Sequence, residues 1–182
     1  VARMSRQAEE QGRLFEGALH CRFVGPPGTG KTSAAMRMGE LLHAMGLVSR
    51  GHVHTVNPVG DLISQYAGDY AQRVAHHFQQ ARGGVLFIDE AYQLAEQEQG
   101  RLVVHQIVQT LTSPGFADTA VVLAGYRDAM NSLVASNPGL QSRIPNEIVF
   151  DALTDDELVE LFHRTLGKQN LVVHEADRPE VG

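Results

Sequence analysis

The sequence contains a single cysteine, no tryptophan and only 6% aromatic residues in its 182 positions. One cysteine excludes an internal disulfide framework, so the fold depends on an apolar core, for which 43% hydrophobic content is sufficient. Cys21 falls in an expected core strand and is interpreted as a small buried hydrophobe rather than a nucleophile. No apolar run approaches the roughly 20 residues that cross a membrane, and no signal-peptide segment is visible. This composition is typical of a cytoplasmic protein.

Charge of one sign is not concentrated anywhere along the chain. The formal net charge of −6 is spread over many positions, which argues against nucleic acid as a partner, although a local basic pore is compatible with this charge. Nine histidines are present, but neither the pair His52 and His54 nor the pair His76 and His77 has a cysteine or a second close cluster beside it. Because a tetrahedral site needs such a set, we expect no structural metal site.

The most informative segment is residues 25–32, GPPGTGKT, which matches the phosphate-binding pattern G-x-x-x-x-G-K-[ST]. Its glycines let successive backbone N–H groups point at one centre, and the following helix adds its positive end. Lys31 is expected to reach the β- and γ-phosphates of ATP, and the Thr32 hydroxyl to help hold Mg²⁺. A short apolar strand before the loop and an amphipathic helix to about Met45 supply the expected context. The predicted nucleotide contacts are Gly25, Pro26, Pro27, Gly28, Thr29, Gly30, Lys31, Thr32 and Ser33.

An acidic pair follows the unbroken apolar run VLFI at residues 85–88. Asp89 is expected to hold Mg²⁺ through water, and Glu90 to polarise a water for attack on the γ-phosphate. The alternative is an acidic pair at a solvated turn. Because the acidic pair and the phosphate loop occur together in this chain, we favour a single phosphoryl-transfer site. The adjacent Glu90 also argues against GTPases and small-molecule kinases. Lys31, Asp89 and Glu90 are therefore predicted catalytic residues.

Apolar segments that alternate with helical patterns predict a three-layer α/β domain with a parallel sheet. The expected strands are residues 21–24, 52–56, 85–88, 120–124 and 148–150. Helices are expected after the phosphate loop, in two pieces over 61–80 broken near Gly68, and over 102–111. Residues 137–139, Asn-Pro-Gly, predict a turn. Residues 154–157, TDDE, form a capping box that opens a helix through Leu166.

In these segments the chain resembles the AAA+ ATPases of the CbbX/CfxQ type, a group that includes SpoVK-like proteins and the EccA ATPases of type VII secretion. The resemblance runs from about Phe23 to Leu166. It rests on a combination of segments: LLH at 41–43 with Gly46, QYAG at 65–68, GGVLFIDEAY at 83–92, AGY at 124–126 and SNPGLQSR at 136–143.

The resemblance implies the organisation of the chain. It implies a P-loop NTPase domain with a five-stranded parallel sheet in the order 5-1-4-3-2. A helical arm over residues 1–19 would precede a core over 20–152, and residues 153–182 would begin an incomplete helical lid. We therefore expect a piece of a longer protein that binds ATP weakly and hydrolyses it slowly by itself.

The resemblance also implies site residues beyond the phosphate loop. Arg143 matches the arginine that inserts into the neighbouring subunit's site in a ring, commonly a hexamer, and its forked donors suit a transition-state phosphate. Family members often carry a second arginine where this chain has Gln141. Tyr126 and Arg127, after the fourth strand, are candidates for the sensor residue that orients the attacking water in such proteins. The alternatives are packing at the strand end for Tyr126 and a solvated charge for Arg127.

Tyr66, Ala67 and Gly68 match the aromatic loop that lines the central pore of such rings and grips an extended polypeptide. Periodicity offers an alternative, because Val59, Leu62, Ile63 and Tyr66 have the spacing of one helix face.

The implied function is chaperone-like remodelling of a protein substrate by a homo-oligomeric ring that uses ATP and Mg²⁺. The substrate is an inhibited Rubisco in the CbbX branch and a secretion system in the EccA branch. Two other functions stay open, namely an ATP-dependent switch that threads nothing and a DNA- or RNA-acting AAA+ protein.

Overall fold

The computed structural model describes residues 19–63 and 68–168, which divide between Phe150 and Asp151 into two compact units. A five-stranded sheet with strand order β2-β3-β4-β1-β5 forms the centre of the first unit, and every pair of neighbouring strands is parallel. This is the predicted order 5-1-4-3-2, read from the other edge. The strands are β1 Cys21–Val24, β2 Val53–Val56, β3 Val85–Ile88, β4 Ala120–Gly125 and β5 Asn146–Val149.

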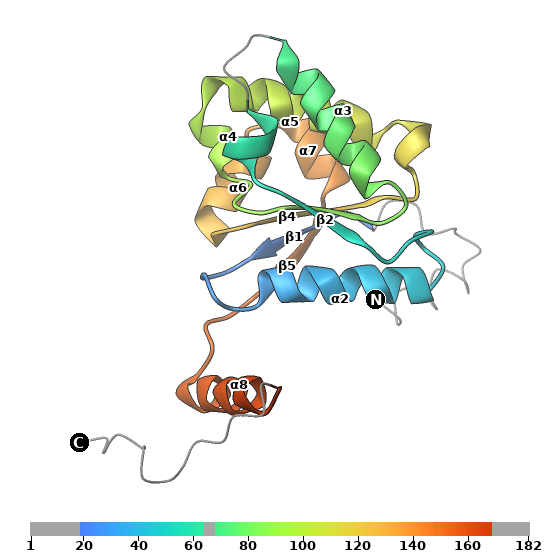
Figure 1. Ribbon diagram of the computed structural model, residues 1–182. Helices are drawn as coiled ribbons and strands as arrows, with labels where there is room; N and C mark the ends of the chain where they lie inside the picture. Colours follow the sequence, from blue (N-terminus) through green and yellow to red (C-terminus); the bar gives the residue numbers. More distant parts are fainter. Residues whose placement is uncertain (1–18, 64–67, 169–182) are drawn as a thin grey trace, which may run out of the picture. The chain divides into compact units, whose positions relative to one another are not determined.

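Helices cover both faces of this sheet (Figure 1). Helix α2 (Lys31–Ala44) lies on one face, and all the other labelled helices of this unit lie on the opposite face. Those helices are α3 Asp69–Ala81, α4 Gln93–Glu96, α5 Glu98–Leu111, α6 Arg127–Ala135 and α7 Pro138–Arg143. The predicted three-layer α/β architecture is therefore confirmed.

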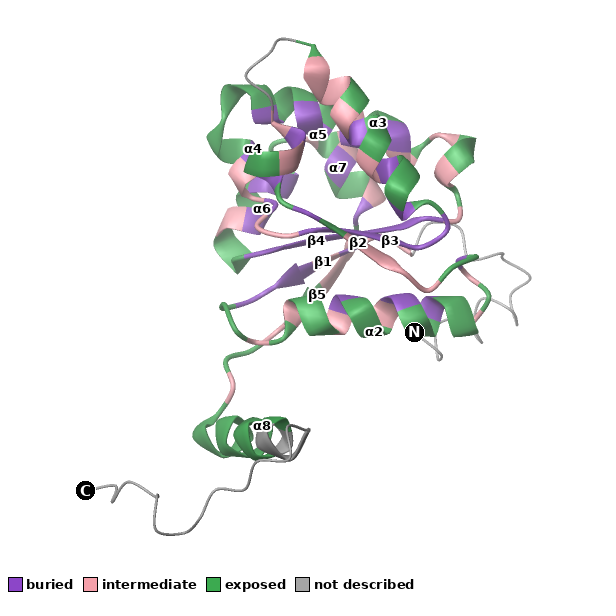
Figure 2. Cartoon of the chain, in the orientation of Figure 1, coloured by how far each residue is buried: buried purple, intermediate pink, exposed green. Residues whose placement is uncertain are grey.

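The neighbouring interior strands β3 and β4 divide their side chains between two apolar cores. In β3, Leu86 and Ile88 pack under the larger helical layer, whereas Val85 and Phe87 pack under α2. Side chains alternate in the same way along β4, because successive residues of a strand point to opposite faces. Burial on both faces explains why β3 and β4 are unbroken apolar runs, and Figure 2 shows both strands as buried. Cys21 is 3% exposed in the core beneath α2, as predicted.

Several predicted boundaries were wrong. Residues 137–139 do not form a free turn, because Asn137 accepts a hydrogen bond from the Leu140 N–H and Pro138 begins α7. The first piece of the predicted 61–80 helix is a π-helical turn, η1 (Pro58–Leu62), capped by Asn57. Helix α5 begins four residues before the expected position 102, and α6 was not predicted.

Helix ends follow the sequence signals more closely. Gly46 follows the C-cap of α2 in the left-handed region, with φ 69°, and donates its N–H to the His43 carbonyl at 2.9 Å. In the second unit, α8 (Asp155–Lys168) opens with the predicted capping box. The Glu157 carboxylate accepts the Thr154 N–H at 2.8 Å, and the Thr154 hydroxyl accepts the Glu157 N–H at 3.3 Å. The Thr154 N–H, and after it the Thr154 hydroxyl, donate to the Glu157 carboxylate and hold its pKa below the ordinary value. None of the helices described here has the length and apolar character needed to span a bilayer.

Candidate functional site

The loop between β1 and α2 has a backbone that depends on glycine. Gly28 and Gly30 have φ angles of 77° and 89°, in the left-handed region where other residues are strained. Neither position is crowded, so the backbone conformation alone requires glycine there. At Gly25 glycine is required because space is lacking: a Cβ atom there would overlap the Phe150 carbonyl. The loop thus brings its backbone close to the end of β5.

The N-terminus of α2 has the features of an anion site. Its N-cap is Gly30, no side chain caps the helix, and no acidic residue lies in the first turn. The N–H groups of that turn, which includes Thr32 and Ser33, are therefore not satisfied by a side-chain cap, and the positive end of the helix dipole is not neutralised. These residues fit a phosphate group.

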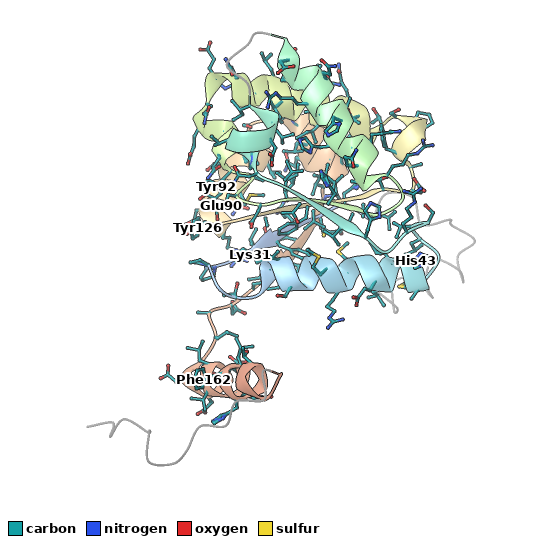
Figure 3. All side chains as sticks on the ribbon, viewed as in Figure 1. Lys31, His43, Glu90, Tyr92, Tyr126 and Phe162 are labelled. Atoms are coloured by element: carbon teal, nitrogen blue, oxygen red, sulfur yellow. The ribbon has the colours of Figure 1, made fainter. Side chains whose placement is uncertain are left out.

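Lys31 is folded over the same loop. Its Nζ donates to the Gly25 carbonyl at 2.9 Å and to the Pro26 carbonyl at 2.6 Å, and the Thr29 hydroxyl donates to the Pro26 carbonyl at 2.9 Å. The ammonium group is thereby held beside the N-terminus of α2, at the end of the sheet where Figure 3 labels Lys31. A lysine charge next to N–H groups that no side chain caps is suited to the outer phosphates of a nucleotide.

Backbone hydrogen bonds tie together the ends of three strands. The Gly25 N–H donates to the Gly125 carbonyl at 3.1 Å, and the Ala91 N–H donates to the Ala124 carbonyl at 2.9 Å. Strand β4 lies between β1 and β3, so the phosphate loop and the acidic pair are separated by two strand spacings, about 10 Å. A phosphate chain and its metal ion fit across that distance.

Glu90 has an unusual backbone. Among the described residues it is the only non-glycine residue with positive φ, at 52°, a conformation that costs a residue with a Cβ about 1–3 kcal/mol and is common at active sites. Its N–H donates to Asp89 Oδ1 at 3.0 Å, and its Oε2 accepts a hydrogen bond from the Tyr92 hydroxyl. That hydrogen bond to the Glu90 carboxylate is the main cause that raises the pKa of Tyr92 to about 12.

The predicted metal ligands fit Mg²⁺ chemically. Asp89 follows β3 directly and is only partly buried, and Thr32 is exposed in the first turn of α2. A carboxylate and a hydroxyl are hard oxygen ligands, which Mg²⁺ prefers together with water and phosphate oxygens. The described residues contain no group of three or more histidine, cysteine, aspartate or glutamate side chains that could hold a metal by themselves.

The two sensor candidates have different surroundings. Tyr126 is 44% exposed, and its ring centroid is 5.6 Å from that of Tyr92. Figure 3 shows Tyr126, Tyr92 and Glu90 at the same end of the sheet. Arg127 instead pairs with Glu147 on β5 at 3.2 Å, and Glu147 also binds Arg22 at 2.8 Å. The Arg22 hydrogen bond is the main cause that lowers the pKa of Glu147. The structure therefore brings Tyr126, rather than Arg127, next to the Glu90 cluster.

Arg143 lies on a different element from this cluster. Arg143 ends α7, where its Nη1 donates to the Gly139 carbonyl at 3.1 Å. Its Nε is buried without a hydrogen-bond partner among the residues described. Tyr66 and Ala67 lie outside the described residues, and Gly68 is the left-handed N-cap of α3, with φ 93°. Helix η1 ends at Leu62, and Ile63 is extended.

Sequence reasoning did not identify Tyr92 as a site residue. Tyr92 was noted only as the last residue of the segment GGVLFIDEAY, which carries the family resemblance. A signal was present, because a tyrosine two positions after a carboxylate at a strand end can reach back to it when the chain turns. The left-handed conformation of Glu90 makes that turn, and no sequence pattern predicts this conformation.

A parallel sheet whose first strand enters a helix through a glycine-rich loop, with an acidic pair ending β3, defines a P-loop nucleotide-binding protein. The chain belongs to the family of ATPases associated with various cellular activities (AAA), which matches residues 21–152.

Curated relatives narrow this assignment. The chain is 42% identical over 161 residues to Protein CfxQ of Xanthobacter flavus, with 85% of this chain and 50% of that protein covered. It is 42% identical over 156 residues to Protein CbbX of Cereibacter sphaeroides, with 84% and 50% covered. It is 40% identical over 164 residues to the CfxQ homolog of Pyropia yezoensis, with 88% and 54% covered. The chain spans about half the length of the curated relatives it matches.

Solved structures share the fold at lower identity. A variant of RuvB from Thermotoga maritima has a TM-score of 0.63 at 22% identity, with 93% of this chain and 50% of that chain covered. The AAA domain of FIGL-1 in complex with ADP has a TM-score of 0.58 at 20% identity, with 82% and 48% covered. At these identities the likeness shows the fold alone.

Proposed function

We propose that this chain binds Mg²⁺–ATP at the ends of β1, β3 and β4 and hydrolyses it, with Glu90 as the general base. The observation that supports this proposal is the Glu90 carboxylate, which accepts a hydrogen bond from Tyr92. Glu90 lies in a left-handed turn directly after β3, and backbone hydrogen bonds join that end of β3 through β4 to the phosphate loop. The N–H groups of the loop and of α2, with Lys31, would hold the phosphates, and Thr32 and Asp89 would hold Mg²⁺. Mg²⁺ would neutralise charge on the phosphates.

Hydrolysis is proposed to be shared between subunits of a homo-oligomeric ring. Arg143 lies on α7 and has no hydrogen bond to the phosphate loop or to Glu90 in the structure described. A guanidinium at that position can serve a neighbour's site, where its permanent charge would stabilise the transition state. A hexamer is the ring size that the family resemblance implies.

The work done with ATP is proposed to be remodelling of a protein partner. The CbbX/CfxQ resemblance implies a Rubisco-related substrate, and Tyr66, Ala67 and Gly68 would contact it in the pore. If turnover rises when the protein partner is added, and the rise is lost in Tyr66→Ala, remodelling is supported. Indifference to both changes would favour a switch that threads nothing.

A mixing experiment tests the shared site. Lys31→Ala removes nucleotide binding from a subunit's own site, and Arg143→Ala removes the charge that it lends to a neighbour. Each variant alone should hydrolyse Mg²⁺–ATP slowly, because every interface lacks one group. Mixed subunits should recover turnover, since some interfaces then combine an intact Lys31 with an intact Arg143. No recovery in the mixture, with each variant folded, would contradict a shared site.

A further inference from the structure

Tyr92 is held from several sides in the orientation that meets Glu90. Its ring packs against Tyr126 with centroids 5.6 Å apart, and a Cβ atom at Gly125 would lie only 2.7 Å from Tyr92 Cδ1. Its carbonyl accepts the Ala95 N–H at 2.8 Å, which fixes its backbone at the start of α4. The ring thus fills a space that β4 keeps open by ending in glycine.

The same turn fixes Glu90. The Glu90 carbonyl accepts the Gln93 N–H at 3.0 Å, the Glu90 N–H donates to Asp89, and the Tyr92 hydroxyl donates to Oε2. The backbone and one carboxylate oxygen are therefore both restrained, while Oε1 stays available for another donor. A general base needs this arrangement, because one oxygen has to point steadily at the proton that it accepts.

We propose that Tyr92 is the positioning residue for Glu90, and that Tyr126 supports it by packing on its ring. This inference rests on the proposed function, in which Glu90 accepts the proton of the attacking water. Tyr92 itself does not touch that water. With its pKa raised to about 12, the phenol keeps its proton through the neutral range and stays a donor to Oε2. The pair also connects the end of β4, beside the phosphate loop, to the catalytic carboxylate.

Tyr92→Phe tests this role in the full chain, because it removes only the hydroxyl and keeps the ring against Tyr126. We expect kcat for Mg²⁺–ATP to fall about 10-fold, a part of the roughly 10²–10⁴-fold that a general base contributes. KM and the equilibrium affinity for ATP should stay within about twofold, since no phosphate contact changes. Tyr70→Phe is the matched control: it removes a hydroxyl from α3, a helix that supplies none of the residues that hold Glu90, and should leave kcat unchanged.

A second measurement separates positioning from a structural effect. In a Glu90→Gln background, Tyr92→Phe should lower the residual turnover by much less than 10-fold, because the base through which it acts is gone. An equal fractional loss in both backgrounds would overturn the inference, and so would an unchanged kcat or a raised KM in Tyr92→Phe alone.

The proposed function fails in a different way. Absence of turnover in the wild-type chain, or wild-type turnover in Glu90→Gln, would overturn both ideas together. Normal turnover in the wild type, its loss in Glu90→Gln and its retention in Tyr92→Phe would overturn the role of Tyr92 alone.

Discussion

Gly125→Ala should destabilise the first unit and disturb Glu90 at the same time. Gly125 is the buried last residue of β4. A Cβ atom there would lie 2.7 Å from Tyr92 Cδ1 and 3.0 Å from Met130 Sδ, whereas carbon atoms in contact prefer about 3.5–4.0 Å. The ring or the strand therefore has to move by close to 1 Å.

The cost follows from which neighbour can yield. Met130 has a flexible thioether that can change rotamer, but the Tyr92 ring is confined by Tyr126 and by its hydrogen bond to Glu90. Overpacking of this kind costs about 1–3 kcal/mol in free energy of unfolding. In a chain of this size each kcal/mol lowers Tm by about 2–4 °C, so we expect a fall of about 2–12 °C.

Urea unfolding followed by circular dichroism measures this cost, with an unchanged m-value expected. Gly60→Ala is the matched control, because a Cβ atom there meets nothing within 4 Å and the backbone φ is not left-handed. It should be neutral or slightly stabilising. Tyr92→Ala should remove most of the penalty of Gly125→Ala, since it vacates the contested space. Additive effects of the two substitutions, or a Gly125→Ala protein as stable as wild type, would refute this reasoning.

Three further predictions concern acid stability, subunit cooperation and substrate contact. His54 Nε2 and His77 Nδ1 are 2.9 Å apart, and burial is the main cause that lowers both pKa values below 6.5. The unfolded chain therefore binds more protons than the folded chain below pH 6.5, and the free energy of unfolding should fall as the pH drops from 6.5 through the folded pKa values. Urea unfolding at a series of pH values below 6.5 measures this, and a free energy of unfolding that does not change with pH would contradict the prediction. Arg143→Ala should reduce kcat at least about 100-fold while ATP affinity persists. An unchanged kcat would exclude a role for Arg143 in a neighbouring subunit's site. Tyr66→Ala should abolish the stimulation of ATP turnover by a protein substrate but keep basal turnover. Stimulation that persists in Tyr66→Ala would exclude a pore role.

The fold could be predicted from the sequence because its signals are local. Val85 to Ile88 is apolar at every position, which indicates burial on both faces, and the structure places that strand inside the sheet, between β2 and β4. The capping box at Thr154 and the glycine after α2 also act within a few residues. The error at residues 137–139 has a physical reason: Asn-Pro is as good a helix start as a turn.

The candidate site was predictable as residue types but not as an arrangement. Lys31, Asp89 and Glu90 belong to motifs with a known mechanism. The left-handed backbone of Glu90 and the packing of Tyr126 on Tyr92 involve the ends of β3 and β4, which are far apart in sequence. The ion pair of Arg127 with Glu147 on β5 is also long-range. Such contacts depend on how the strands are ordered, so they follow from the tertiary structure alone.

Glu90→Gln tests the central claim most directly. ATP affinity and single-turnover hydrolysis should be measured on the same full-chain preparation, with Mg²⁺ present. The amide keeps the shape and a hydrogen-bond acceptor for Tyr92 but accepts protons poorly, so ATP should bind as in the wild type. Hydrolysis should fall about 10²–10⁴-fold. Wild-type hydrolysis by Glu90→Gln, or loss of ATP binding with hydrolysis per bound ATP unchanged, would contradict the assignment of Glu90 as the general base.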